Sequence, residues 1–266
     1  MKVFVEGIGV WAAGLEGWAS SREVLAGMRP YVPAPLTVPP SPLLPPNERR
    51  RTVATVRLAL KVGAEAFANA GRDPSATATV FTSSGGDGET LHGILESLST
   101  AELDVSPTRF HNSVHNAPAG YWTIATRSRE PSTSLCAFDA SFSAGLLDAA
   151  AQAVFDHCAV ALIAYDLPYP EPLHSARAIG STFGVAFVLT PEPTRASFAR
   201  LTLALGRGFT APTSLADAAL ETLRQGNPAA RSLPLLQALA RGSEAEIALD
   251  HVNGNTIAIS IAPPPW

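Results

Sequence analysis

The sequence contains few of the residues that would mark a disulfide-bonded, nucleic-acid-binding or membrane protein. It has two cysteines among 266 residues, Cys136 and Cys158, which are too few for a disulfide framework and favour a reducing compartment. Its formal net charge is −4, so it lacks the basic excess typical of nucleic-acid-binding proteins. It contains no apolar run long enough to cross a bilayer, and the start of the chain resembles a first strand more than a signal peptide. We therefore expect a cytoplasmic globular protein that binds no nucleic acid.

Proline, in contrast, is abundant, with 23 residues in the chain. Eight of these prolines fall between residues 30 and 46. Proline lacks a backbone N–H and has a fixed φ, so this stretch can form neither a helix nor a central strand. We expect an extended excursion on the surface, most simply a loop insertion without a function of its own.

The remaining sequence alternates between strand and helix patterns. Residues 48–70 give the clearest helix, with apolar residues at helical spacing and Gly71 as a C-terminal cap. Further helices are predicted at 17–27, 114–126 and 141–155, and strands at 3–10, 76–82, 132–138, 159–165, 182–190 and 198–205. This order predicts an α/β protein with a largely parallel sheet covered by helices on both faces. Small helices follow at 215–240, and a hairpin at 246–252 and 256–261 turns at Asn253 and Gly254.

Two familiar kinds of functional motif are weak in this sequence. The glycine-rich loop at 83–88 follows a strand, but it lacks the phosphate-binding signatures and a basic residue, so a tight turn is the better interpretation. His111 and His115 have the spacing of metal ligands, but no acidic or cysteine partner lies near them in sequence. His251 follows Asp250 directly, and neighbouring residues on a strand point to opposite faces, which argues against an acid–base pair. We expect no metal site and no cofactor.

The segment 106–145 carries a more specific pattern. Asn116, Ala119 and Gly120 match an Asn-x-x-Ala-Gly helix, and Pro131 and Ser132 match the end of a Gly-Pro-Ser turn in which Glu130 replaces the glycine. A strand and a long alanine-rich helix follow. These motifs, in this order, resemble the N-terminal half of β-ketoacyl synthases. The resemblance extends over about residues 2–204.

The resemblance implies a truncated thiolase-like fold of the α/β class, mainly the N-terminal half-repeat, with a mixed sheet covered by helices. Residues 1–206 would form this half domain, including the proline-rich excursion at 30–46. Residues 207–266 would add a short helical segment and a C-terminal β-hairpin packed on the same domain. The two catalytic histidines of the family's second half have no counterpart, because His251 matches neither of their motifs.

In the register of this resemblance, Asp139 occupies the position of the nucleophilic cysteine. A helix N-terminus lowers the pKa of a thiol and would stabilise the aspartate anion in the same way. Asp139 could be a simple N-terminal cap of the following helix, which is the interpretation we prefer. It could also act as the base of a thioesterase or a decarboxylase. Cys136 lies three residues too early to replace the nucleophile, so we expect no catalytic residue.

The resemblance also suggests a function. We expect a non-catalytic subunit of the chain-length-factor type, which pairs with a full-length ketosynthase in type II, aryl-polyene-like biosynthesis and shapes the tunnel for a chain held by an acyl carrier protein. The family pairs edge to edge through the strand at 132–138. The residues expected at the tunnel or the partner interface are Phe110, His111, Val114, His115, Asn116, Tyr121, Trp122 and Ser134. Ordinary core packing is the alternative for each aromatic residue. The alternative functions are a stand-alone acyl-thioester enzyme that uses Asp139 and a homodimeric acyl-binding protein.

Overall fold

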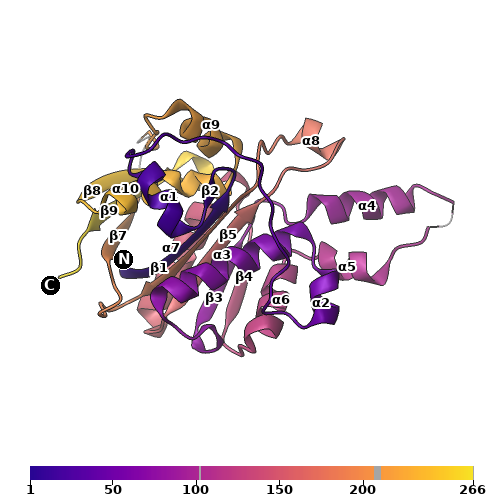
Figure 1. Ribbon diagram of the computed structural model, residues 1–266, viewed down its shortest axis with the longest axis horizontal. Coiled ribbons are helices and arrows are strands. Elements are labelled where there is room, and N and C mark those ends of the chain that lie inside the picture. The colour runs from indigo at the N-terminus through magenta and orange to yellow at the C-terminus, as the bar shows by residue number, and fades with distance from the viewer. Residues whose placement is uncertain (102, 207–210, 266) are drawn as a thin grey trace.

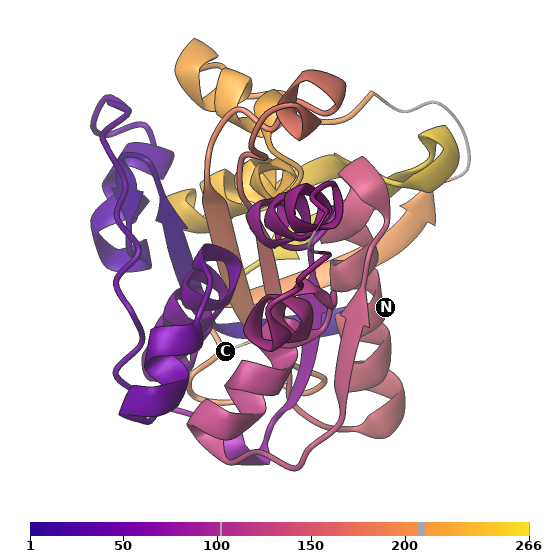
Figure 2. The same ribbon diagram turned by 90° about the vertical axis from the view of Figure 1, so that its right-hand side faces the viewer.

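The computed structural model describes residues 1–101, 103–206 and 211–265, which form one mixed sheet with helices on both faces (Figures 1 and 2). The nine-stranded sheet has the strand order β4-β3-β5-β6-β1-β7-β9-β8, with β2 paired to β1. Its strands are β1 (Lys2–Ala12), β2 (Leu15–Glu16), β3 (Ala78–Thr82), β4 (Ser132–Leu135), β5 (Val160–Asp166), β6 (Phe183–Thr190), β7 (Ala199–Gly206), β8 (Ala245–Asp250) and β9 (Thr256–Ala262).

The prediction of a largely parallel sheet was wrong. Parallel pairing joins β3 to β4 and to β5, whereas β6, β1, β7, β9 and β8 each pair antiparallel with their neighbours. A parallel return needs a crossover of a dozen or more residues, usually with a helix. Between β5 and β6 the chain forms only the one-turn helix α8 (Leu173–Ala176), and β6 therefore returns alongside β5 in the opposite direction.

Helices α3 (Ala54–Ala70) and α6 (Ala117–Thr126) cover one face of the sheet, and α7 (Ser141–Asp156), α1 (Trp18–Leu25) and α10 (Leu233–Arg241) cover the other. Each face has its own buried apolar cluster. The remaining helices are α2 (Pro46–Arg51), α4 (Gly88–Leu98), α5 (Pro107–Ser113) and α9 (Ala218–Gly226). Helices α4 and α5 project from the body at the right of Figure 1.

The alternation of residues in β1 explains how α3 packs so closely on the sheet. Val3 and Val5 share the α7 side with Ile8 and Val10, because a β-bulge between Val5 and Gly7 shifts the alternation by one residue. The opposite face then carries glycine at positions 7 and 9. A Cβ atom on Gly9 would lie 2.0 Å from the carbonyl oxygen of Val62 on α3. Only glycine permits this approach of helix to strand.

Several predicted elements are shorter than the sequence pattern suggested. The helix predicted at 48–70 is divided into α2 and α3, because Thr52 and Val53 adopt extended backbone conformations. The helix predicted at 114–126 begins at Ala117, where Pro118 occupies an early position that requires no backbone N–H. The strand predicted at 132–138 ends at Leu135, and it is half-exposed and not buried because β4 is an outer strand of the sheet.

The proline-rich segment is bound to the body of the domain at several points. The Tyr31 hydroxyl donates to the Ala13 carbonyl at 2.7 Å, and the Trp11 indole donates to the Thr37 carbonyl at 3.2 Å. Leu44 is buried in the cluster beneath α3. The segment therefore has no regular structure as predicted, but it is packed against the domain.

The hairpin of β8 and β9 continues the sheet beyond β7. Strand β9 pairs with β7 along its full length, and Ile257, Ile259 and Ile261 complete the core under α10. In the parts of the chain described above, no helix combines the length and apolarity needed to cross a membrane.

Candidate functional site

The predicted nucleophile position lies at the carboxyl end of β4, where the chain turns into α7. Phe138–Ala140 form a 3-10 turn, and Phe138 has a φ of 54°, a left-handed conformation that side chains other than glycine rarely adopt. The side chain of Phe138 is exposed. The strand, turn and helix therefore present residues 138 and 139 at the surface, beside the ends of β3 and β5.

Asp139 is held by two arginines at this turn. Its Oδ1 accepts a hydrogen bond from Arg177 at 2.8 Å, and its Oδ2 lies 3.2 Å from the guanidinium of Arg231. The interpretation of Asp139 as a helix cap was wrong. Ser141 supplies the local side-chain contacts instead, accepting from the Ala137 N–H at 3.0 Å and donating to the Phe138 carbonyl at 2.6 Å. The cations that compensate the Asp139 charge come from distant parts of the chain.

These ion pairs continue into the C-terminal segment. Arg231 also lies 3.4 Å from Asp250, which in turn pairs with Arg224 at 3.3 Å. Arg224 binds Glu221 at 2.7 Å, and its hydrogen bonds are the main reason that the pKa of Glu221 falls to about 2. The network therefore joins the turn before α7 to α9 and to the end of β8. Sequence reasoning missed these partners because nothing in their local pattern marks them.

Arg177 also contacts the residue before Asp139. Its guanidinium carbon lies 3.6 Å from the centroid of the Phe138 ring, which is cation–π geometry. The two side chains border a cavity of about 240 Å³ that Ile179, Gln225 and Pro228 also line. Both oxygens of the Asp139 carboxylate are thus engaged by guanidinium groups, which makes it a paired anion at this turn.

Behind this turn, the loop after β3 surrounds a buried carboxyl group. Asp166, at the end of β5, accepts hydrogen bonds from the hydroxyls of Ser83 and Ser84 and from the Ser84 backbone N–H, at 2.7–3.1 Å. Burial raises the pKa of Asp166 to about 6, although these hydrogen bonds act in the opposite direction. The glycine-rich loop thus donates hydrogen bonds to this carboxyl group. This arrangement fits a tight turn better than it fits a phosphate-binding site.

The predicted interface residues fall into two groups, of which the first lies at or near the surface. Phe110 and Val114 have exposed fractions of 66% and 46%. Asn116 and Ser134 lie together in a hollow of about 410 Å³ between α6 and β4, with Ala119, Gly120, Thr123 and Ser132. His115 contacts the Ser83 carbonyl through Nε2 at 3.2 Å. The structure therefore brings Asn116 and Ser134 together in one hollow, and it leaves Phe110, Val114 and His115 outside the lining of this hollow.

The second group faces inward, which corrects the expectation that these residues form a surface. Trp122 is 1% exposed and packs on Phe67 and Phe81, with ring centroids 5.4 and 6.3 Å apart. Tyr121 is equally buried, and the edge of the exposed His111 ring meets it at 5.8 Å. Aromatic residues on the inner face of an amphipathic helix usually belong to the hydrophobic core. A partner would have to displace the residues that cover Tyr121 and Trp122 before it could contact them.

Several of the exposed large apolar side chains come from neighbouring elements, of which α4 and α5 face the viewer in Figure 2. We call the following residues the apolar surface: Leu91, Leu95, Leu98, Leu103, Phe110, Val114, Ile124 and Phe138. They come from α4, α5, α6, the segment between α4 and α5, and the turn after β4. Helix α5 packs on both α4 and α6, and exposed apolar side chains on neighbouring elements are typical of an interaction site. The sequence signal was the spacing of Leu91, Leu95 and Leu98 on α4.

Sequence comparison identifies the family. The β-ketoacyl synthase N-terminal domain matches residues 18–252, which is most of the chain. The chain belongs to this family. The resemblance inferred from residues 106–145 is thereby confirmed. Among curated proteins, no sequence matches this one.

Solved structures of ketosynthases share the fold. A chain from the ketosynthase ApeO in complex with its chain length factor ApeC, from Xenorhabdus doucetiae, aligns with a TM-score of 0.72 at 21% identity, covering 98% of this chain and 99% of that one. A chain of the ishigamide ketosynthase/chain length factor aligns at 0.73 with 14% identity over 99% and 100% of the two chains. A chain of the AntDE:AntF complex of a type II polyketide ketosynthase with its acyl carrier protein aligns at 0.74 with 10% identity over 98% and 99%. The predicted ketosynthase-like α/β fold with a mixed sheet is therefore confirmed.

Proposed function

We propose that this β-ketoacyl synthase family member is a non-catalytic, chain-length-factor-type subunit that pairs with an active β-ketoacyl-ACP synthase in type II, aryl-polyene-like biosynthesis. The observation that carries the proposal is the paired carboxylate at the nucleophile position. Asp139 is bound by Arg177 and Arg231, where a condensing enzyme of the family has a reactive thiol. Two structural neighbours come from a ketosynthase with its chain length factor, which supports the same assignment.

The chemistry available at Asp139 argues against independent condensation. Attack by a carboxylate on an acyl thioester would give an anhydride, which water hydrolyses readily. Before any attack, Asp139 would also have to give up two charge-assisted contacts, each stronger than a neutral hydrogen bond. A thioesterase or decarboxylase that uses Asp139 as its base meets the same obstacle, because both carboxylate oxygens are already engaged by the two arginines.

The surface around β4 supports a partner of related fold. Strand β4 is the outer strand at one end of the sheet and presents unpaired backbone groups at its open edge. Helix α6, which carries Ile124 of the apolar surface, packs against β4, and α5 packs on α6. An open strand edge beside exposed leucine, valine and phenylalanine side chains is suited to sheet extension with flanking apolar contacts. A ketosynthase subunit offers the matching edge by virtue of the shared fold.

The hollow between α6 and β4 is the proposed contribution to the acyl tunnel. Asn116 and Ser134 line its wall, together with the small residues Ala119 and Gly120. It opens on the side where the partner would dock, so the partner would close it. We propose that an acyl chain delivered by an acyl carrier protein to the partner's active site extends into this closed space. The residues that narrow it would then set the length of the product.

Co-expression with the ketosynthase encoded nearest to it tests the pairing. We expect the two chains to elute together as a 1:1 complex, and we expect the double variant Phe110→Glu, Val114→Glu to abolish this complex while remaining folded. The matched control is Phe155→Glu, because Phe155 is 75% exposed on α7, outside the apolar surface. A stable homodimer that ignores the ketosynthase would refute the assignment and favour a homodimeric acyl-binding protein.

A cytoplasmic location completes the proposal. Both cysteines are free, and Cys136 is exposed, which suits a reducing compartment. Fractionation of the native cells would test this location directly.

A further inference from the structure

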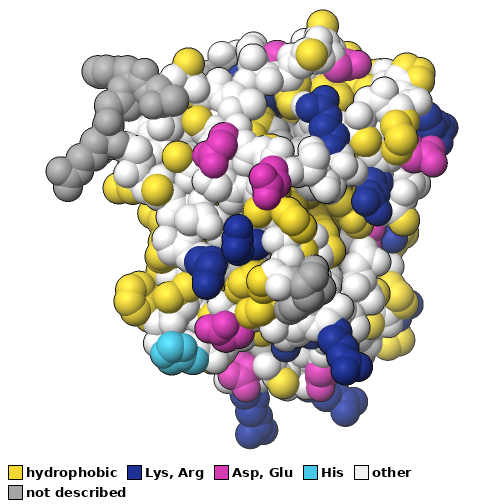
Figure 3. Space-filling model, turned by 90° about the vertical axis from the view of Figure 1, so that its left-hand side faces the viewer, with side chains coloured by type: hydrophobic (Ala, Val, Ile, Leu, Met, Phe, Trp, Pro, Cys, Tyr) yellow, Lys and Arg dark blue, Asp and Glu magenta, His cyan; other side chains and the backbone are white. Residues whose placement is uncertain are grey.

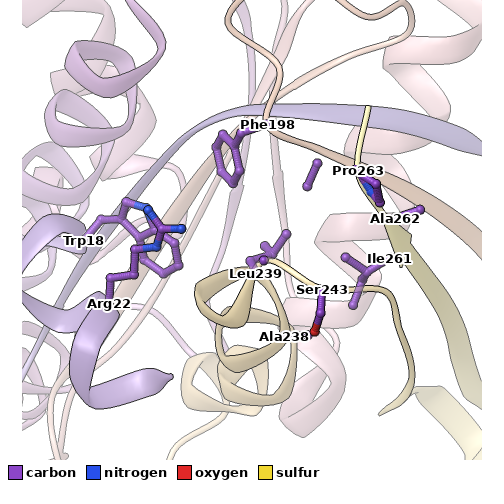
Figure 4. Close-up of a pocket in the computed structure, with 11 residues that line it drawn as sticks. Trp18, Arg22, Phe198, Ala238, Leu239, Ser243, Ile261, Ala262 and Pro263 are labelled. Atoms are coloured by element: carbon purple, nitrogen blue, oxygen red, sulfur yellow. The ribbon is translucent and has the colours of Figure 1, made fainter. Parts of the chain in front are cut away.

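A second cavity lies at the other end of the sheet, outside the region that the proposed function uses. Helices α1 and α10, the start of β7 and the end of β9 surround it, and its volume is about 410 Å³. In Figure 4 the side chains of Trp18 and Arg22 form one wall and those of Ile261, Ala262 and Pro263 the opposite one, with Phe198 and Leu239 between them. The volume falls within the range of about 300–1,000 Å³ that is typical of small-molecule sites.

The walls of this cavity are apolar with a single charge. Two aromatic rings, from Trp18 and Phe198, face aliphatic side chains, and the polar side chains of the lining are those of Arg22 and Ser243. No acidic residue lines it within the described part of the chain. In Figure 3, which shows this end of the molecule, hydrophobic side chains gather near the middle of the face, with both basic and acidic side chains around them. The lining therefore fits an apolar body that carries one negative charge.

Arg22 is held in place without being neutralised. Its Nε donates to the Ala240 carbonyl in the last turn of α10 at 3.3 Å, which fixes the guanidinium beside the cavity. The neighbouring Glu23 is directed to Arg29, at 3.5 Å. Within the residues that the structure describes, no carboxylate lies within 4.0 Å of the Arg22 guanidinium. The two terminal nitrogens of Arg22 are thus free to bind a carboxylate in the bidentate manner typical of arginine.

We propose that this cavity binds a small free carboxylic acid with an aryl or acyl body, its carboxylate on Arg22 and its apolar body between Trp18, Phe198 and Leu239. The aromatic walls and the aliphatic floor stabilise the body by burial, and the single cation sets the charge and orientation of the ligand. Ser243 is the other polar side chain of the lining, on the side of Ile261 (Figure 4).

The site is independent of the proposed function. The cavity is bordered by β7 and β9, whereas the proposed interface lies at β4, at the far end of the strand order. A ligand in this cavity and a partner at β4 can therefore be present at the same time. Failure of the pairing experiment would not contradict the proposed binding site. Failure to bind an acid would not contradict the proposed pairing.

Titration calorimetry with octanoate and cinnamate as probes tests the site, using the full chain or its purified complex. Octanol and cinnamyl alcohol have the same bodies without the charge, and we expect them to bind at least tenfold more weakly. We expect Arg22→Gln to weaken binding of both acids at least tenfold, because the glutamine can still donate to the Ala240 carbonyl but carries no charge. Ser243→Phe, a filling substitution at an exposed position, should abolish binding.

Arg241→Gln is the matched control, because it removes the same charge from the neighbouring end of α10 without lining this cavity. It should change the affinity less than twofold. Two results would overturn the proposal: acids that bind no better than their alcohols, and an affinity that Arg22→Gln and Arg241→Gln reduce equally. Absence of binding by both acids at millimolar concentration would overturn it as well.

Discussion

The carboxylate of Asp139 and the guanidinium of Arg177 form a hydrogen-bonded ion pair of 2.8 Å across the turn that precedes α7. This pair places a negative charge at the position that the family resemblance aligns with a nucleophilic thiol. Arg231 completes the arrangement from a later part of the chain, so residues far apart in the sequence converge on one side chain. The turn before α7 is thereby tied to residues 177 and 231.

Replacement of Asp139 by asparagine should lower the free energy of unfolding by about 1 kcal/mol. The side chain of Asp139 is 39% exposed, so solvent screens both of its ion pairs and keeps the effect small. Urea denaturation at low and at high salt measures it, and the loss should shrink as salt screens the pairs. Glu23→Gln, which removes only the exposed pair with Arg29, should give no resolvable change. Equal losses in both variants would contradict a structural role for Asp139.

Local sequence patterns gave the alignment that places Asp139 at the predicted nucleophile position. They also predicted most of the helices and strands. Patterns within a few residues report periodicity and capping, and they located α3, α7 and the final hairpin. The partners of Asp139 could not be found in this way, because Arg177 and Arg231 reach it only through the tertiary fold. The direction of β6 was also misjudged, since strand order and direction depend on the connection and not on the strand itself.

Trp122 illustrates the same limit for the candidate interface. Its place on a family helix suggested a surface role, but the face on which it lies is set by the packing of α6 against α3. A Cβ atom on Gly63 would approach the Trp122 ring to 2.7 Å, so the indole fills the space that this glycine leaves. Sequence alone gives the helix and its apolar residues, but not which of them point inward.

Trp122→Ala should therefore destabilise the protein by about 3–5 kcal/mol, the usual cost of removing a large buried aromatic side chain. The reason is the loss of its contacts with Phe67 and Phe81 and the cavity left behind. Ile124→Ala is the matched control on the same helix, because Ile124 is 45% exposed, and it should cost less than about 1 kcal/mol. Chemical denaturation measures both. If Trp122→Ala leaves stability unchanged, a role for Trp122 in lining a tunnel becomes the better interpretation.

The buried carboxyl group of Asp166 should make stability depend on pH. Its pKa is raised by burial to about 6 from an ordinary value of 3.8, so the folded protein binds this proton more tightly than the unfolded chain does. The stabilisation is complete below pH 3.8 and is lost as the pH rises through about 6. Asp166→Asn should therefore flatten the stability profile between these limits, removing a contribution of up to roughly 3 kcal/mol.

Unfolding in urea at intervals between about pH 3 and pH 7 would measure this difference. Asp73→Asn is the informative control, because hydrogen bonds from Ser75 lower the pKa of the exposed Asp73 carboxyl and give the opposite sign. There the wild type should be favoured at neutral pH, and the advantage should fade as the pH falls below the ordinary range of an aspartate. A profile for Asp166→Asn that is parallel to the wild type would show that the carboxyl group titrates normally.

The open edge of β4 allows the sharpest test of the pairing. The N–H of Thr79 on β3 donates to the Pro131 carbonyl at 3.0 Å, and Thr79 is in register with Ser132. Because backbone groups alternate along a strand, the amide of Thr133 faces β3 and that of Ser134 faces the open edge. Ser134→Pro then removes a donor that the folded chain does not use internally but that an added strand would need.

We expect Ser134→Pro to fold with near wild-type stability and to lose the ketosynthase from the co-purified complex. Ser134→Ala keeps the backbone amide and should retain the partner. This variant therefore distinguishes the contribution of the backbone N–H from that of the Ser134 hydroxyl in the hollow. Thr133→Pro should instead destabilise the chain itself, because it removes a bond to β3. Co-purification with melting temperature as the folding control measures all three. If Ser134→Pro retains the partner at wild-type yield, the two subunits do not join through the edge of β4, and the apolar surface alone must carry the contact.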